Sequence, residues 1–118
     1  MRWTAILLLL AMGAPGDGIS GKWQGGFRAG GADHDVAQLI TLHESSTTLK
    51  GSGGPDATEQ YPIANGYLKG DQVHFEITTG ELKFFYDLKL SGQTLSGKLT
   101  LKSAADTRSA QVKLTRGQ

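Results

Sequence analysis

One cluster in the sequence has residue types that bind metal ions. Asp33, His34 and Asp35 are adjacent in a segment where we expect a loop, and carboxylate oxygens and imidazole nitrogens both suit divalent metals. A second expected loop contains Asp56 and Glu59, which would add oxygen ligands if the two loops met. Acidic residues in such segments more often form a solvated turn. We therefore predict a turn with no metal or other cofactor, and keep a metal ion bound by residues 33–35 as the alternative.

Motifs for enzymatic chemistry are absent from the sequence. The chain has no cysteine, which excludes thiol nucleophiles, disulfides, zinc–thiolate clusters and a lipid anchor on cysteine. A catalytic serine needs a positioned histidine and an orienting acid, but no GxSxG elbow, phosphate-binding loop or HExxH motif is present. His43 and His74 fall at outward positions of expected strands, where we predict exposed side chains. We predict that the protein is not an enzyme.

Aromatic side chains at inward positions of the expected strands are the remaining candidates for a site. An eight-stranded barrel is just wide enough to be filled by side chains or to hold one small ligand. Burying a Phe side chain fully contributes about 1.5–3 kcal/mol, so packing alone also explains these residues, and a filled interior stays open beside an apolar ligand cavity. For a cavity, we predict the lining residues Phe27, Tyr61, Phe75, Phe84 and Tyr86.

Strict alternation of apolar and polar residues predicts the strands that position these side chains. In residues 82–101, leucine and aromatic side chains alternate with polar ones on both sides of Ser91-Gly92-Gln93, which is typical of an antiparallel hairpin with one wet face. No window has convincing helical periodicity. The expected strands are Gly21–Arg28, Val36–His43, Thr48–Gly53, Gln60–Leu68 (around Tyr61, Ile63 and Tyr67), Gln72–Thr78, Leu82–Leu90, Leu95–Leu101 and Ser109–Arg116.

The short links between these strands predict the topology. None is long enough for a parallel crossover, so neighbouring strands should pair antiparallel. We therefore predict an all-β fold, an eight-stranded antiparallel up-and-down (meander) barrel that leaves no open sheet edge. The links Ala29–Asp35, Gly54–Glu59 and Lys102–Arg108 are the longest and follow odd-numbered strands. They should therefore gather at one end and form a loop-decorated mouth.

Composition restricts the partners of such a barrel. The 118 residues carry a formal net charge of +1 and no basic block, which gives no support for binding nucleic acid or an anionic membrane. Glycine is abundant, with 17 residues, as suits the bends and close strand approaches of a tightly curved sheet.

The first 18 residues have the pattern of a secretory signal peptide. Met1-Arg2 provides a positive start, residues 3–12 are apolar, and small residues follow. A membrane span would need about 20 apolar residues, so this run is too short for one. We predict a signal peptide over 1–18, one barrel domain over 19–118, and export to the periplasm or the medium.

The two ends of the barrel sequence resemble the lipocalin, avidin and fatty-acid-binding families. Gly21-Lys22-Trp23 opens the first strand and Arg116 closes the last one at an inward position. In those families an Arg or Lys of the last strand covers a Trp of the first, so the resemblance implies a structural Trp23–Arg116 seal at the closed end. The chain is shorter than true lipocalins, lacks their helix and disulfide, and lacks the polar loop residues of avidins. It looks most like small exported bacterial barrel domains of unknown function.

Two functions follow as expectations. The first is an exported, monomeric, lipocalin-like barrel that binds a small apolar ligand at its mouth. The alternative is a protein-interaction or inhibitor module with a filled core, which would use the mouth loops or the sheet face near Phe85. Phe85 lies at an outward position between Lys83 and Asp87, and an exposed aromatic side chain can mark a contact surface.

Overall fold

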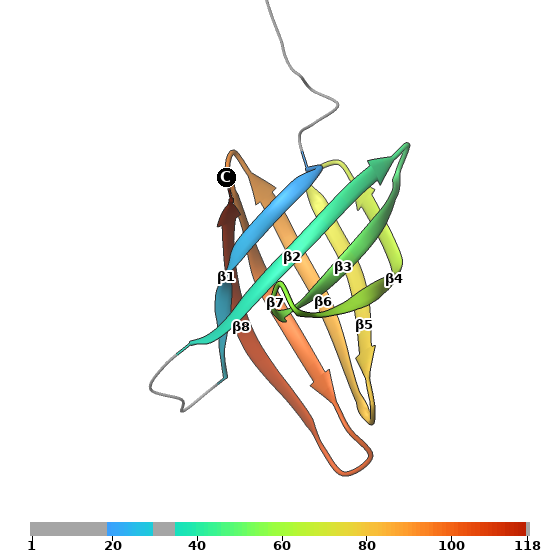
Figure 1. Cartoon of the computed structure of the whole chain (residues 1–118), viewed down its shortest axis with the longest axis vertical. Coiled ribbons are helices and arrows are strands. Elements are labelled where there is room, and N and C mark those ends of the chain that lie inside the picture. Colours follow the sequence, from blue (N-terminus) through green and yellow to red (C-terminus); the bar gives the residue numbers. More distant parts are fainter. Residues whose placement is uncertain (1–18, 30–34, 118) are drawn as a thin grey trace, which may run out of the picture.

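Each strand of the protein pairs with the strands before and after it in the sequence, and the last pairs with the first. The computed structural model describes residues 19–29 and 35–117, and these form a closed antiparallel barrel in the order β1 to β8 (Figure 1). The strands are β1 (Gly21–Ala29), β2 (Val36–Ser45), β3 (Thr48–Asp56), β4 (Glu59–Lys69), β5 (Gln72–Thr79), β6 (Leu82–Ser91), β7 (Thr94–Lys102) and β8 (Thr107–Arg116).

The predicted fold class, an all-β barrel of eight antiparallel meander strands, is confirmed. The described residues contain no helix long and apolar enough to cross a membrane. The signal peptide predicted over 1–18 lies outside the described residues and stays a prediction.

Inward side chains from all strands except β4 form one buried apolar core. The alternation expected for β5 is observed, because Val73, Phe75 and Ile77 are buried while the residues between them are not. Burial of this kind is the dominant favourable term in folding. The other buried apolar residues are Ile19, Trp23, Phe27, Ile40, Leu42, Leu49, Tyr86, Leu88, Leu95, Leu99, Ala110, Val112 and Leu114.

β4 departs from the predicted alternation at its middle. Its pairing with both neighbours is irregular near Gly66, and Asn65 has a positive φ of 53°. An extra residue of this kind shifts every later side chain to the opposite face. Tyr61 and Ile63 therefore lie against the core, but Tyr67, which we expected with them, is 47% exposed on the outer surface. The prediction for Tyr67 was wrong.

The loop predicted over Gly54–Glu59 is a tight turn. β3 continues to Asp56, β4 begins at Glu59, and only Ala57 and Thr58 connect them. The Asp56 carboxylate accepts hydrogen bonds from the Thr58 hydroxyl and from the amides of Thr58 and Glu59, at 2.8–2.9 Å. The hydrogen bond from the Thr58 hydroxyl is the main cause that lowers the pKa of Asp56, and the two amides add to it. The loop at this side of the mouth is therefore shorter than we predicted.

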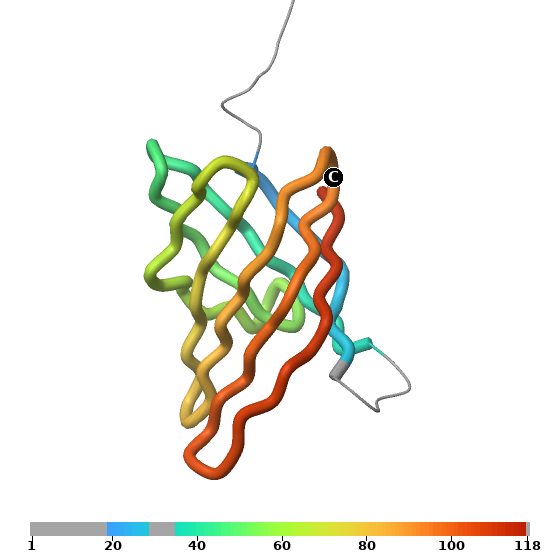
Figure 2. The backbone as a smooth tube through the Cα atoms, turned by 180° about the vertical axis from the view of Figure 1, so that it is seen from behind, coloured from blue at the N-terminus to red at the C-terminus, as the bar shows by residue number. Residues whose placement is uncertain are grey.

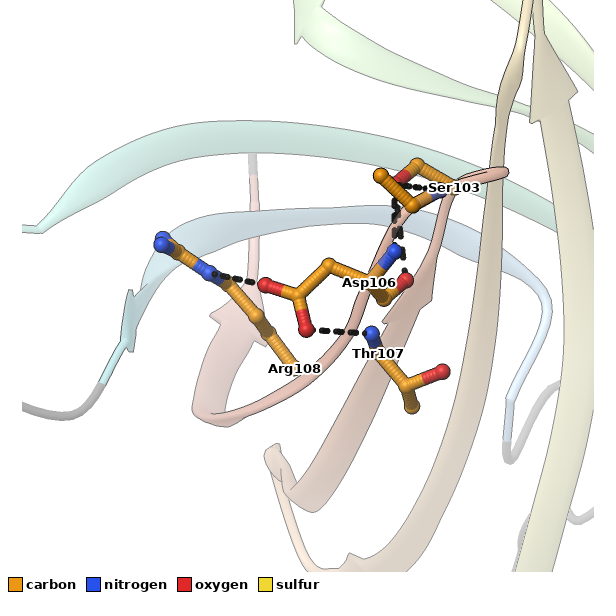
Figure 3. A network of polar contacts seen from close by, with 5 residues as sticks. Ser103, Asp106, Thr107 and Arg108 are labelled. Atoms are coloured by element: carbon orange, nitrogen blue, oxygen red, sulfur yellow. Dashed lines mark hydrogen bonds and ion pairs between the residues drawn. The ribbon is translucent and has the colours of Figure 1, made fainter.

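The turn between β7 and β8 is longer and is held by polar contacts (Figure 3). The Ser103 amide donates to the Asp106 carbonyl at 2.9 Å, and the Asp106 carboxylate accepts from the Thr107 amide and pairs with Arg108. The tips of the β5–β6 and β7–β8 hairpins project further at this end than the β3–β4 turn (Figures 1 and 2). We call the β5–β6 and β7–β8 hairpins the tall wall of the mouth, and the β3–β4 turn its low wall.

Candidate ligand-binding site

The end of the barrel opposite the mouth is closed by Trp23 and Arg116. The two residues are paired across β1 and β8, and the Arg116 guanidinium lies 4.4 Å from the centre of the Trp23 ring. Trp23 is fully buried and donates its indole N–H to the Ile19 carbonyl at 2.8 Å. Arg116 donates to the Ser20 carbonyl and to the Gln93 side chain, each at 2.8 Å. These contacts fill the described part of the barrel at this end.

The mouth holds a pocket of about 200 Å³ inside the barrel. Four of the five predicted cavity residues line it: Phe27, Tyr61, Phe84 and Tyr86. Phe75 does not line it: it is fully buried, with its ring stacked on that of Tyr86, its partner across β5 and β6, at 4.5 Å between centroids. The remaining lining residues are Val36, Gln38, Gly53, Gly54, Pro55, Glu59, Ile77 and Thr79.

Sequence reasoning missed Gln38, although a signal for it was present. Gln38 lies two residues before Ile40 and therefore shares its inward face, where a polar residue is unusual. Its side chain is only 7% exposed, and its Oε1 accepts a hydrogen bond from the Tyr86 hydroxyl at 2.6 Å. Burial raises the pKa of the Tyr86 phenol far above its ordinary value. The hydroxyl is therefore protonated at neutral pH and can donate to Gln38.

Glu59 is the charged residue that lines this pocket among residues 19–29 and 35–117. Tyr61 donates its hydroxyl to the Glu59 carboxylate at 2.6 Å, and this hydrogen bond is the main cause that raises the pKa of Tyr61. Both residues contribute to the low wall, since they lie at the start of β4. The pocket therefore combines aromatic and aliphatic walls, a buried amide–phenol pair and one carboxylate.

A second polar cluster lies on the outer surface around His74. Its Nδ1 is 2.8 Å from Asp87 Oδ1, its Nε2 is 2.8 Å from Glu76 Oε2, and the Tyr67 ring stacks on it at 5.1 Å. The prediction of an exposed His74 was wrong, since only 16% of its side chain is exposed. Partial burial lowers the pKa of His74, but the hydrogen bonds and charges of the two carboxylates outweigh it and raise the pKa above its ordinary value.

The His74 cluster predicts a pH dependence of stability. The pKa of His74 is about 6.5 in the unfolded chain and higher in the folded one. The contribution is complete below about pH 6.5 and is lost as the pH rises through the folded pKa, because neutral imidazole has one N–H for two carboxylates. We expect the free energy of unfolding of the wild type, measured with urea, to fall relative to that of His74→Gln as the pH rises above about 6.5.

The matched control for this prediction is His43→Gln. His43 lies on the outer surface of β2 and is exposed, so its replacement should leave the pH profile of the wild type unchanged. If wild type and His74→Gln have parallel profiles over this range, the two carboxylates do not hold a protonated His74.

Phe85 and Asp35 do not belong to the mouth pocket. Phe85 is half-buried, and the Lys102 ammonium lies over its ring, 5.1 Å from the ring centre. Asp33 and His34 lie outside the described residues, and Asp35 pairs with Arg28 at 2.9 Å. Among residues 19–29 and 35–117, no group of three acidic or histidine side chains is arranged to hold a metal ion.

A larger hollow of about 390 Å³ lies outside the barrel, along the His74 cluster. Its lining includes the charged side chains Asp71, Asp87 and Lys89. Those charges stay hydrated there, so an apolar molecule would displace well-bound water for little gain. The mouth pocket is therefore the better candidate for binding a small apolar ligand.

Known proteins give no further indication of the function. Neither protein-family models, nor curated protein sequences, nor solved structures match this chain.

Proposed function

We propose that the protein binds one small, mainly apolar molecule in the mouth pocket and acts as an exported, non-enzymatic, lipocalin-like binding protein. The observation that carries the proposal is a pocket inside the barrel with aromatic walls and, in the described part of the chain, a single charged lining residue. Binding pockets are typically apolar and concave, with a few placed polar groups. The mouth pocket has this composition.

The volume of the pocket limits the size of the ligand. Pockets for drug-sized molecules have about 300–1,000 Å³, whereas a cavity of about 150 Å³ holds benzene. At about 200 Å³, the mouth pocket suits a molecule of one or two rings. The partly buried Phe84 and Leu101 of the tall wall would contact any part of the ligand that extends beyond the pocket.

The lipocalin-like part of the proposal is supported at the closed end. The Trp23–Arg116 contact has the arrangement that the resemblance to lipocalins, avidins and fatty-acid-binding proteins implies. A guanidinium over an indole contributes about 0.5–2 kcal/mol and closes the barrel opposite the mouth. A barrel with one sealed and one open end is the architecture of a binding protein with a single entrance.

The proposal predicts that a large side chain at the rim blocks binding. Val36 lines the pocket and is 44% exposed, so Val36→Trp places an indole at the entrance without disturbing the buried core. We expect wild type to bind naphthalene, measured by isothermal titration calorimetry, and Val36→Trp to lose at least about tenfold in affinity, which is about 1.4 kcal/mol.

Leu82→Trp provides the matched control for this experiment. Leu82 is 41% exposed near the same end but does not line the pocket. It should bind naphthalene as the wild type does. Equal loss in both variants, or no binding by the wild type, would refute the proposed site.

The alternative function as a protein-interaction module has less support. It placed the contact surface near Phe85, whose ring is half-buried and covered by Lys102. The mouth loops that it also invoked are reduced on the β3–β4 side to a two-residue turn.

A further inference from the structure

Gln38 is the only buried polar or charged residue among those that the structure describes. It belongs to the lining of the mouth pocket together with Tyr86, its hydrogen-bond partner. Burying an amide is unfavourable unless its hydrogen bonds are made, so the use of each of its donors and acceptors is informative.

The hydrogen bonds of Gln38 fix the orientation of its amide. Oε1 accepts from the Tyr86 hydroxyl at 2.6 Å, and Nε2 donates to the Ala37 carbonyl at 3.0 Å. Turning the amide over would place its oxygen against the Ala37 carbonyl oxygen, two acceptors facing each other. The NH₂ group therefore stays on the Ala37 side, and the oxygen stays on the Tyr86 side.

The Gln38–Tyr86 pair can make two further hydrogen bonds, one as a donor and one as an acceptor. The amide nitrogen carries two hydrogens, and only the bond to Ala37 uses one of them in the described part of the chain. The Tyr86 hydroxyl donates its single hydrogen to Gln38. Its oxygen can still accept a hydrogen bond through its lone pairs.

We infer that the ligand of the mouth pocket is a neutral aromatic molecule with one hydroxyl group, and that this hydroxyl binds at the Gln38–Tyr86 pair. The inference rests on the proposed function and adds the chemical class of the ligand. A hydroxyl accepts from the Gln38 N–H and donates to the Tyr86 oxygen, so it completes both groups at once. A carbonyl completes only the first, and an ammonium has no lone pair for Gln38.

The surroundings of the pair select against an anion. Among the described residues no Lys, Arg or His lines the pocket, and Glu59 adds a negative charge to its wall. A buried carboxylate would lose its hydration without a cationic partner.

The aromatic rings at the pocket favour a flat ligand. Phe75 and Tyr86 are stacked within 19° of parallel, and Phe84 and Tyr86 within 13°. A planar ring in the pocket extends this row with offset stacking.

The test compares 2-naphthol, naphthalene and 2-naphthoate by titration calorimetry with the protein purified from expression of the full chain. We expect wild type to bind 2-naphthol about tenfold more tightly than naphthalene, and 2-naphthoate more weakly than either. In Gln38→Met, which keeps the length of the side chain, and in Tyr86→Phe, which keeps the ring, this preference should disappear. Thermal melting of each variant verifies that it is folded. One folded variant of the two is sufficient to test whether the preference for 2-naphthol disappears.

The outcomes distinguish failure of the role of the Gln38–Tyr86 pair from failure of the proposed function. Wild type that binds naphthalene and 2-naphthol equally, or a tenfold preference that persists in a folded variant, overturns the role of the pair while the proposed function stands. Tightest binding of 2-naphthoate overturns the neutral class. Absence of binding for all three molecules overturns the proposed function as well.

Discussion

Trp23→Ala will lower the free energy of unfolding by about 3–5 kcal/mol. Trp23 is the largest fully buried side chain among the described residues. Its removal leaves a cavity between Ile19, the start of β1 and the end of β8. It also leaves the Ile19 carbonyl without its indole donor and Arg116 without the ring beneath it. Urea denaturation followed by circular dichroism measures the loss.

Two milder variants separate the contributions to this effect. Trp23→Phe keeps a ring under Arg116 but loses the hydrogen bond to Ile19, and we expect a cost of about 1–2 kcal/mol. Arg116→Met removes the cation and keeps an apolar cover. If Trp23→Ala is within about 1 kcal/mol of wild type, Trp23 does not seal the barrel.

Gly51→Ala will cost about 3–5 kcal/mol, from backbone strain and overlap with the neighbouring strand. Gly51 has a φ of 142°, and a Cβ atom there would overlap the Thr41 carbonyl oxygen of β2. Gly97 has the same relation to the Asp87 carbonyl of β6. Both glycines lie two residues after a buried leucine, Leu49 or Leu95, and both let adjacent strands approach closely. The same urea measurement should show a similar loss for Gly97→Ala.

Gly92→Ala is the matched control for the glycine substitutions. Gly92 also has a positive φ, of 62°, but its Cβ would meet nothing within 4 Å. We expect only the conformational cost, about 1–2 kcal/mol. If Gly51→Ala costs no more than Gly92→Ala, the close approach of β2 and β3 does not restrict this position.

The barrel could be predicted from sequence because each strand carries its own signal. In β5 and β6 every second side chain is apolar, and this period alone specifies an extended chain with one buried face. Short links then leave antiparallel neighbours as the available topology. Trp23 and Arg116 could be paired in advance because the resemblance implied the contact, and strand parity placed both of them inward.

The irregular part of β4 could not be predicted from the same signals. The shift of parity near Asn65 results from pairing with both β3 and β5, and the period of β4 alone does not reveal it. Tyr67 was therefore placed inward, although it lies outside on His74. The length of the β3–β4 turn depended similarly on the hydrogen bonds of Asp56, which stabilise a turn where composition indicated a loop.

The mouth pocket was predictable in part. The inward aromatic residues Phe27, Phe84 and Tyr86 were visible as candidates, but their depth along the barrel axis was not. Phe75 does not line the pocket although it is paired with Tyr86, which does, and alternation alone does not distinguish the two. Gln38 was not predicted, although its parity with Ile40 places a polar side chain on the inward face of β2.

The most direct test of the account is a nuclear Overhauser measurement on the protein saturated with naphthalene. We predict contacts from the naphthalene protons to Val36, Phe84 and Tyr86 in the mouth pocket, and none to Tyr67 on the outer surface. Contacts to Tyr67 alone, or no contact to any of the three pocket residues at saturation, would contradict it.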